Sequence, residues 1–474
     1  MKKIINKKYI NIENILCLAI ILCPIFDIVS FLYRGAFNST HSPSTILRPI
    51  IPIIVSVYIF FKNDRKFKLY TIGIGCLYFL YGVIHLLVFN SAVTGSSYST
   101  VFHEAQYIIN YTFMILNLFI YIYVFRDSEN NGKLYNSILI ASTIYIVSIY
   151  ISIITKTSSN TYTAEKMGYK GWFESGNSIG AILILSLFII IKFLKEEKYK
   201  KLMILVILLE GIFLTMLLGT RVGLLGFISV IIVYGVTQIV ISLIQNTRVN
   251  KKTIVGCIAA VSVILLLVIA VGSTTIQRRK HLQEIEGNII DKTNNQESHI
   301  TGSLLEIKEK IDNNSLEGDY MNEFQKESVI DLYNICNKLK IKNNDQRMQQ
   351  LIYNIALMKN QKNLTYILVG NGYLANFREL ILEMEIPAFL LNFGVIGFIL
   401  YFIPFLSIWN YGVYIGIKNV KKINESYIML LIGSGFVFAL SFFAGYTFFN
   451  SSNMMIIIVL NTLLINEVEQ LKKN

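Results

Sequence analysis

The chain has 474 residues, of which 54% are hydrophobic and 15% are charged, with a mean hydropathy of +0.53 and a formal net charge of +13. It is too apolar for a soluble protein of this length, which excludes the soluble enzyme classes and makes the lipid bilayer the expected solvent. The positive charge does not indicate nucleic-acid binding, because its excess lies in short connections between apolar stretches, as is typical of a cytoplasmic membrane surface.

Twelve apolar stretches are long enough to span a bilayer as helices, since about 20 apolar residues cross its hydrocarbon core. They lie at residues 14–33, 45–61, 69–89, 106–125, 134–154, 177–194, 202–218, 222–244, 253–275, 386–409, 426–447 and 450–466. The predicted fold is therefore an all-α polytopic membrane protein with about 12 transmembrane helices. Its predicted parts are helices 1–9 (1–275), an extracytoplasmic loop (276–385), and helices 10–12 with a cytoplasmic tail (386–474).

The short connections differ in charge between the two sides of the membrane. Lysine and arginine are concentrated in the N-terminal segment, in the even-numbered connections and in the C-terminal tail. The positive-inside rule therefore predicts a multi-pass protein of the cytoplasmic membrane with both termini in the cytoplasm. The polar loop between the ninth and tenth spans is then extracytoplasmic, and its length exempts it from the rule.

The long loop is predicted to be helical. Apolar residues recur at helical spacing on either side of Asn343 and Asn344, which predict a break and a helix cap. The first stretch contains Val329, Leu332, Ile335, Cys336 and Leu339, and the second contains Met348, Leu351, Ile352, Ile355 and Met358. We expect these helices to pack on each other, to lie on the outer membrane surface or to cover the spans.

The sequence offers no disulfide framework and no metal site. Four of the five cysteines fall within predicted spans, which leaves Cys336 as the one outer thiol. His103, His281 and His299 are expected to be solvated, and no His-x-x-x-His spacing or carboxylate cluster is present. We therefore expect neither a metal ion nor another cofactor.

Arg221 is the most informative single residue. It lies within Gly219–Gly223, where two predicted spans meet outside with almost no connection between them. A charge near lipid is costly and usually faces a polar site, and the planar guanidinium suits phosphate oxygens. Arg221 is therefore a candidate phosphate ligand. The alternative is a structural arginine that binds a helix C-terminus or a lipid phosphate.

A second polar group precedes the sixth span. Glu174 and Asn177 follow the aromatic residues Trp172 and Phe173. Glu174 is a candidate base and Asn177 a candidate substrate ligand. The alternative is that the aromatic residues form an interfacial belt and that Glu174 caps the helix.

A third polar group leads into the tenth span. Gly370 and Gly372 form a Gly-x-Gly turn, which is followed by the charged residues Arg378, Glu379, Glu383 and Glu385. We expect these residues to lie opposite Arg221. Arg48 and Asp27, near the outer ends of the second and first spans, are expected to extend the same charged region, or else to form an ion pair or snorkelling anchors.

These features resemble the O-antigen polymerase and ligase superfamily, whose members are multi-spanning glycosyltransferases that act on lipid-linked sugars at the outer face of the cytoplasmic membrane. The likeness in layout, with twelve spans and a long loop after the ninth, covers nearly the whole chain. In detail it rests on the short motifs Pro24–Asp27, Phe173–Asn177, Gly219–Arg221, Gly370–Gly372 and Asn392–Gly394. The ligase branch has a histidine shortly after the Gly-x-Gly turn, where this chain has none before the tenth span, so the polymerase branch is favoured.

The resemblance implies transfer of a growing glycan from a polyprenyl diphosphate carrier onto a lipid-linked repeat unit, as in the synthesis of a capsule or exopolysaccharide. Fixed arginines would stabilise the charge that develops on the departing diphosphate, and a carboxylate would take the proton of the acceptor hydroxyl. The expected catalytic residues are Arg221, Arg378, Glu174 and, behind it, Glu383. The expected ligands of the substrate and its diphosphate are Arg221, Arg378, Arg48, Asn177, Gly370 and Gly372.

The expected partners are the polyprenyl-diphosphate-linked oligosaccharide, membrane lipids and other polysaccharide-assembly proteins, with no nucleic acid. The alternatives are ligase-like transfer of the glycan to another acceptor, a lipid-linked oligosaccharide flippase or other transporter, a mannosyltransferase-like enzyme, and a non-enzymatic sensor or assembly protein. A transporter should show repeat symmetry, which the sequence lacks. A mannosyltransferase-like enzyme should have paired acids in the first outer loop, and residues 34–44 contain no Asp or Glu.

Overall fold

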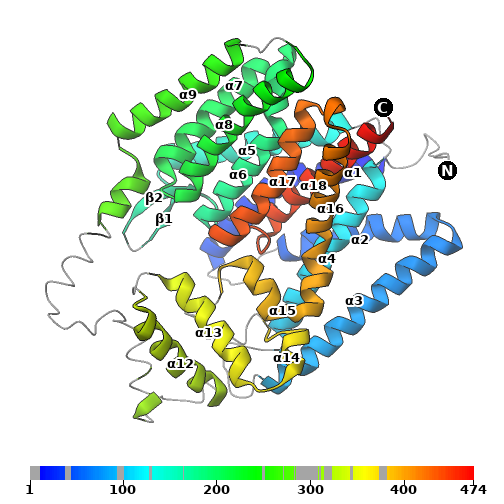
Figure 1. Cartoon of the computed structure of the whole chain (residues 1–474), viewed down its shortest axis with the longest axis vertical. Helices are drawn as coiled ribbons and strands as arrows, with labels where there is room; N and C mark the ends of the chain where they lie inside the picture. The colour runs from blue at the N-terminus through cyan, green and yellow to red at the C-terminus, as the bar shows by residue number, and fades with distance from the viewer. Residues whose placement is uncertain are drawn as a thin grey trace.

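The computed structural model of the chain is almost entirely helical (Figure 1). It describes residues 11–37, 44–92, 101–126, 131–163, 165–247, 251–270, 272–281, 283, 308, 311–313, 323–341, 345–372 and 382–473. The main bundle consists of α1 (Ile12–Phe37), α2 (Ser44–Lys62), α3 (Arg65–Ala92), α4 (Val101–Phe125), α5 (Asn131–Ile154), α6 (Gly176–Ile190), α7 (Glu197–Ile212), α8 (Arg221–Ile244), α9 (Lys251–Ala270), α15 (Glu385–Tyr401), α16 (Ile403–Lys418), α17 (Glu425–Phe443) and α18 (Ser451–Lys473). Short helical turns, η1 (Ile191–Lys195), η2 (Phe213–Leu217) and η4 (Val420–Lys422), continue α6, α7 and α16.

Within the described ranges, nine helices are long and apolar enough to cross a membrane, or ten when the bent pair α15 and α16 is counted as one span. The predicted all-α polytopic membrane fold is therefore confirmed. Each of the twelve predicted spans coincides with a helix or a broken helix. The second and seventh correspond to α2 and to α7 with its π-helical continuation η2, which are not among the nine.

The predicted tenth span is wrong in one respect, because residues 386–409 do not form a single helix. α15 and α16 meet at an angle of 47° after Tyr401, and Pro404 lies in the first turn of α16. Proline lacks the backbone N–H that would continue the hydrogen-bond ladder, so a break just before it is expected. Gly394 adds a second irregularity within α15, where its φ is +67°.

α6 lies at the centre of the bundle. Every residue of α6 except Asn177 is buried, and the helix contacts α5, α8, α17 and α18. α9, in contrast, lies at the periphery against α8, with most of its surface exposed (Figure 1). Lipid is as apolar as these side chains, so close packing rather than the removal of apolar surface from water stabilises the central helix.

One end of the bundle is called the insert end here, because the segment between α9 and α15 emerges from it. The alternating chain direction brings together at this end the N-termini of α2, α6, α8, α15 and α18 and the C-termini of α1, α5, α9 and α17. An antiparallel hairpin that the sequence did not predict, β1 (Ser159–Tyr162) and β2 (Met167–Gly171), lies there between α5 and α6. In Figure 1 the insert lies at the lower left, and the last turn of α18 lies at the upper right.

The insert is helical where it is described, as the sequence predicts. It contains α12 (Glu323–Leu339), α13 (Gln346–Asn360) and α14 (Leu364–Val369). α12 and α13 pair around a small apolar core of Val329, Leu332, Cys336, Tyr353 and Leu357. Asn343 and Asn344 lie outside the described residues, and the observed cap of α13 is Asp345, whose side chain accepts a hydrogen bond from Met348 N at 3.3 Å. α13 and α14 both contact α15, which attaches the insert to the bundle.

Candidate functional site

Arginines gather at the insert end of the bundle. They come from α1, α2, α8, the segment after α9, and α13, and they are Arg34, Arg48, Arg221, Arg278, Arg279 and Arg347. Four of them form ion pairs with carboxylates that are distant in sequence, namely Arg34 with Glu174, Arg48 with Asp27, Arg278 with Glu165 and Arg347 with Glu383. This end of the molecule therefore offers a set of fixed cations to an anionic ligand.

Arg221, like Arg279, differs from the four paired arginines, because no carboxylate of the described part of the chain pairs with it. It is the first residue of α8, and its side chain is exposed. Thr220 caps the helix by accepting a hydrogen bond from Gly223 N at 3.1 Å. Gly219 has a φ of +81°, a conformation that allows the sharp reversal between η2 and α8. The local sequence thus holds the guanidinium at the end of a helix and leaves it available for a ligand.

The β-hairpin brings a second arginine close to Arg221. The Arg278 guanidinium carbon lies 3.5 Å from the centre of the Tyr162 ring, and its Nε lies 3.4 Å from a Glu165 carboxylate oxygen. Burial raises the pKa of Tyr162 above its ordinary value, and the positive charges of Arg278 and Arg221 oppose that rise. Both arginines therefore lie within electrostatic range of the same phenol.

Glu174 lies just before α6 with more than half of its side chain exposed, and it pairs with Arg34 of α1. The cap of α6 is not Glu174 but Ser175, whose hydroxyl accepts from Ser178 N at 3.4 Å. Lys170 donates to the Glu174 backbone carbonyl at 2.7 Å, and burial lowers the pKa of that lysine. The carboxylate thus has no capping role and is accessible.

Asn177 lies in the first turn of α6 and contacts the end of α17. Its side-chain nitrogen donates to the Ala444 carbonyl at 3.0 Å. Arg347 of the insert donates to the same carbonyl at 2.9 Å and also to the carbonyl of Phe443. Asn177 and Arg347 together therefore satisfy helix-terminal carbonyls that α17 leaves unpaired.

Arg48 forms the most enclosed of the arginine ion pairs. Its guanidinium lies 2.5 Å from Asp27 and also donates to Ser451, and both charged side chains are 19% exposed. The other Asp27 oxygen accepts hydrogen bonds from Tyr145 and Ser452, each at 2.7 Å. The ion-pair alternative for these residues is what the structure shows, and it ties α1, α2, α5 and α18 together.

Glu383 and Glu385 lie at the start of α15 in different surroundings. Glu383 is about one-third exposed, with Arg347 Nε at 3.3 Å, and its backbone N–H donates to Gln350 at 3.1 Å. Glu385 is fully buried and accepts hydrogen bonds from Phe448 N and Phe449 N, both at 2.8 Å. Glu383 is therefore accessible to a substrate, whereas Glu385 holds the loop between α17 and α18.

The Gly-x-Gly turn fits against the irregular part of α15. Asn371 N donates to Leu391 O at 3.0 Å, and Gly372 N donates to Asn392 O at 2.8 Å. Gly370 and Gly372 have φ values of +92° and +78°, and a Cβ on either one would overlap its neighbours. The turn is buried and is fixed to α15 by these hydrogen bonds. Arg378, predicted to lie in the chain that follows the turn, is outside the described residues.

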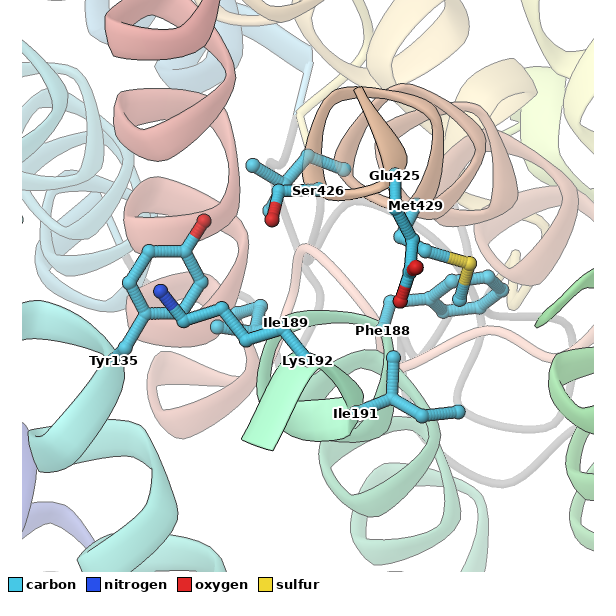
Figure 2. Close-up of a pocket in the computed structure, with 9 residues that line it drawn as sticks. Tyr135, Phe188, Ile189, Ile191, Lys192, Glu425, Ser426 and Met429 are labelled. Atoms are coloured by element: carbon cyan, nitrogen blue, oxygen red, sulfur yellow. The ribbon is translucent and has the colours of Figure 1, made fainter. Parts of the chain in front are cut away.

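The close-up in Figure 2 shows a small cavity at the opposite end of the bundle, lined by Tyr135, Phe188, Ile189, Ile191, Lys192, Glu425, Ser426, Met429 and Leu430. The Lys192 ammonium lies 3.3 Å from the centre of the Tyr135 ring, and Glu425 pairs with Lys195. The cavity has room for about one water molecule, which is too small for a sugar. It lies far from the arginines and does not contribute to the candidate site.

The structure therefore brings together Glu174, Asn177, Arg221, Arg48 and Glu383 at one end of the bundle, with the Gly-x-Gly turn buried beside α15. Sequence reasoning missed Arg34, Arg278 and Arg347, and also a buried contact between His85 and Glu104. His85 carried a signal, because an ionisable residue within an apolar span is unusual. Within the described ranges, no three His, Cys, Asp or Glu side chains are grouped closely enough to hold a metal ion.

Comparison with known proteins relates this arrangement to one family. The family model described as O-antigen ligase like membrane protein matches residues 9–471, which include the bundle except for the last two residues of α18, the insert and every arginine of the insert end. No curated protein matches the chain. No solved structure matches it either.

Proposed function

Because the chain belongs to the O-antigen ligase like membrane proteins, which process glycans carried on membrane lipids, we propose that it is a polysaccharide polymerase. In this proposal it transfers a growing glycan from a polyprenyl diphosphate carrier onto a sugar hydroxyl of a lipid-linked repeat unit. The bond between the anomeric carbon and the diphosphate oxygen breaks, a new glycosidic bond forms, and the acceptor hydroxyl loses a proton. The reaction takes place at the insert end, which we assign to the extracytoplasmic face.

The observation that supports this proposal best is the exposed guanidinium of Arg221, which lies beside Arg278 and pairs with no carboxylate of the described residues. Negative charge grows on the diphosphate as the glycosidic bond to the carrier breaks. Guanidinium groups that are already fixed near those oxygens stabilise that charge without a reorganisation step. We assign Arg221 as the main diphosphate ligand, Arg278 as the second, and Arg378 as a further one from the sequence.

The carboxylates take the proton in this mechanism. Glu174 is the first candidate, because its side chain is more than half exposed, and Glu383 is the second. Each is held by an arginine, Arg34 or Arg347, which orients the carboxylate. A diphosphate that draws the arginine toward its own oxygens would free the carboxylate for the acceptor hydroxyl, which would couple donor binding to activation of the acceptor.

Four predicted ligands have supporting roles in this proposal. The Arg48 guanidinium pairs with Asp27 and donates to Ser451, which favours a role in holding α1, α2 and α18 together. Asn177 donates to the Ala444 carbonyl and so supports the loop beside Arg347. Gly370 and Gly372 contribute through their positive φ values, which let the turn fit against α15.

To test the proposal, the gene is deleted and wild type or a variant is reintroduced. The length of the surface glycan is then measured. Wild type and the R126A variant are expected to give full-length polymer, because Arg126 lies at the opposite end of the bundle and pairs there with Glu469. R221A is expected to insert normally into the membrane and to leave single lipid-linked repeats. Polymer of normal length from R221A would refute the assignment of this arginine.

Ligase-like transfer is the second candidate, because the matching family is described by that activity. The same deletion separates the two reactions. Loss of a polymerase leaves single lipid-linked repeats, whereas loss of a ligase leaves finished polymer on its lipid carrier. A flippase predicts a third result, in which single repeats are retained in the inner leaflet.

A further inference from the structure

Two ionisable residues that the proposed mechanism does not use are buried together between α3 and α4. His85 and Glu104 are both 0% exposed, and the His85 Nε2 lies 2.9 Å from a Glu104 carboxylate oxygen. Placing such groups within membrane helices costs several kcal/mol unless they are paired, and those retained there usually have a function. The burial of this pair therefore indicates that it has a role beyond packing.

The second ring nitrogen of His85 contacts the segment that carries the Gly-x-Gly turn. His85 Nδ1 lies 2.8 Å from the carbonyl oxygen of Val369, the last residue of α14. A carbonyl only accepts hydrogen bonds, so Nδ1 carries the hydrogen and donates it. Nε2 then shares a single proton with Glu104. The carboxylate thereby holds the ring in the orientation in which Nδ1 donates to the Val369 carbonyl.

Side chains of α3 and α4 make two further contacts in this region, one with the turn and one with α15. A Cβ on Gly372 would overlap the Phe89 ring and would lie 3.3 Å from the Glu104 carboxyl carbon, so the turn lies directly against both side chains. Tyr81, one helical turn before His85, donates to the Phe393 carbonyl at 2.7 Å, next to the irregular Gly394 of α15. α3 thus holds both backbone segments that meet at this crossing.

The turn is joined directly to α15, because Asn371 N and Gly372 N donate to the Leu391 and Asn392 carbonyls at 3.0 and 2.8 Å. Glu383, which pairs with Arg347 of the insert, lies just before the first residue of that helix. A shift of the turn would therefore be passed to the start of α15 and to the carboxylates there. A displacement of about 1 Å in a positioning element is enough to reduce catalysis about a hundredfold. The position of the turn is consequently a determinant of the site.

We propose that His85 and Glu104 are positioning residues, which fix the Gly370–Gly372 turn and through it α15, to which the turn is hydrogen-bonded. The pair does not touch substrate. Its effect on chain extension rests on the proposed function, but its effect on the turn does not. The two parts can therefore be tested separately.

The test of the turn uses a Val369→Cys probe in the full-length protein in membranes. Val369 is 4% exposed, so the introduced thiol is expected to be protected from a small water-soluble maleimide. Mass spectrometry of the peptide separates its labelling from that of the five native cysteines. Adding His85→Leu or Glu104→Leu removes one partner of the pair and should speed labelling about tenfold, because a buried donor or acceptor is left unpaired.

Two controls make this result specific. Glu104→Gln keeps a side chain that hydrogen-bonds to Nε2, so labelling should remain slow. Tyr78→Phe removes a comparable hydrogen bond from α3, to the Leu400 carbonyl at 2.8 Å, without affecting the turn, and should also leave labelling slow. Should His85→Leu fail to accumulate in the membrane, Glu104→Leu tests the same link.

Chain extension by the same variants, without the probe, completes the test. Glu104→Leu should lower the maximal extension rate at least tenfold while leaving the apparent affinity for the lipid-linked donor within a factor of three, and Glu104→Gln should restore the rate. Protection of the introduced thiol in both leucine variants would overturn the proposal, as would fast labelling with an unchanged extension rate. If instead the proposed function is wrong, R221A extends chains normally, whatever the labelling result.

Discussion

The Arg347 guanidinium of the insert helix α13 donates a 2.9 Å hydrogen bond to the backbone carbonyl of Ala444, just beyond the end of α17. The same side chain lies 3.3 Å from a Glu383 oxygen and also donates to Phe443. One residue of the insert thus joins two helices of the bundle at the end where the arginines gather. This contact and the adjacent apolar packing of Leu351 and Met358 attach α13 to the bundle, in addition to the packing of α14 on α15 and α3.

The first prediction concerns this attachment. Arg347→Ala should loosen α13 from the bundle, because the Phe443 carbonyl and the Glu383 carboxylate lose Arg347 as a partner and the Ala444 carbonyl retains Asn177 as its donor. Limited proteolysis in membranes should cut the insert several-fold faster than in wild type, and chain extension should fall. Lys359→Ala is the control, since Lys359 lies on the same helix but pairs only with Asp331 of α12. Equal cleavage rates for both variants would contradict the attachment role.

The second prediction concerns the enclosed pair of Asp27 and Arg48. Removal of one partner leaves a largely buried charge, so Arg48→Leu or Asp27→Leu should lower the free energy of unfolding by about 3 kcal/mol. The double variant should recover at least half of that loss, because no isolated charge remains. Thermal unfolding in detergent measures each of these values.

Chain extension by the double variant distinguishes two roles for Arg48. If the arginine is structural, extension returns together with stability. A double variant that is stable but inactive would instead identify Arg48 as a ligand of the diphosphate, as the sequence alone suggests.

The third prediction concerns Gly372. An alanine there would require a φ of +78°, which is unfavourable for a residue with a side chain, and its Cβ would overlap the Phe89 ring. Gly372→Ala should therefore reduce stability by at least about 1 kcal/mol and abolish extension. Gly73→Ala, in α3, meets no neighbour within 4 Å and should be neutral or slightly stabilising. A Gly372→Ala variant as active as Gly73→Ala would show that the turn is not constrained.

The fourth prediction concerns the pH dependence of the insert. Burial raises the pKa of the Cys336 thiol from about 9 to about 11, and the nearby Asp345 adds to this effect. The folded state holds this proton more tightly than the unfolded state does. Its contribution to stability is therefore fully present below pH 9 and is lost as the pH rises toward 11.

Thiol reactivity measures this shift directly. Alkylation of Cys336 in the folded protein should increase with a midpoint near pH 11, whereas the same peptide after unfolding should show a midpoint near 9. Cys336→Ala should remove the loss of stability of the insert over this range. A folded-state midpoint near 9 would mean that the core between α12 and α13 is open to water.

Hydropathy predicted the helices and the insert because burial in lipid acts on every residue of a span. The position of Arg221 was also predictable, since Gly219 and Thr220 are local signals for a reversal and a helix cap. The partners of the charges were not predictable. Arg34 pairs with Glu174 and Arg347 with Ala444 through the packing and rotation of helices that are far apart in sequence, which no local pattern specifies.

The break within the predicted tenth span also depends on contacts between elements that a local sequence pattern does not specify. Pro404 and Gly394 are visible in the sequence, but apolar residues continue on both sides of them, so hydropathy alone predicts one helix. The irregular backbone is tolerated because Gly372 N and Tyr81 satisfy the Asn392 and Phe393 carbonyls from other elements. That compensation exists only in the folded structure.

The affinity of the purified protein for polyprenyl diphosphate tests the central assignment most directly. Wild type and R126A should bind the carrier equally well in lipid nanodiscs, and R221A should bind at least about tenfold more weakly, because it loses a charge-assisted contact to the phosphate oxygens. Equal affinity for wild type and R221A would contradict the account, since Arg221 would then not be the cation that holds the diphosphate.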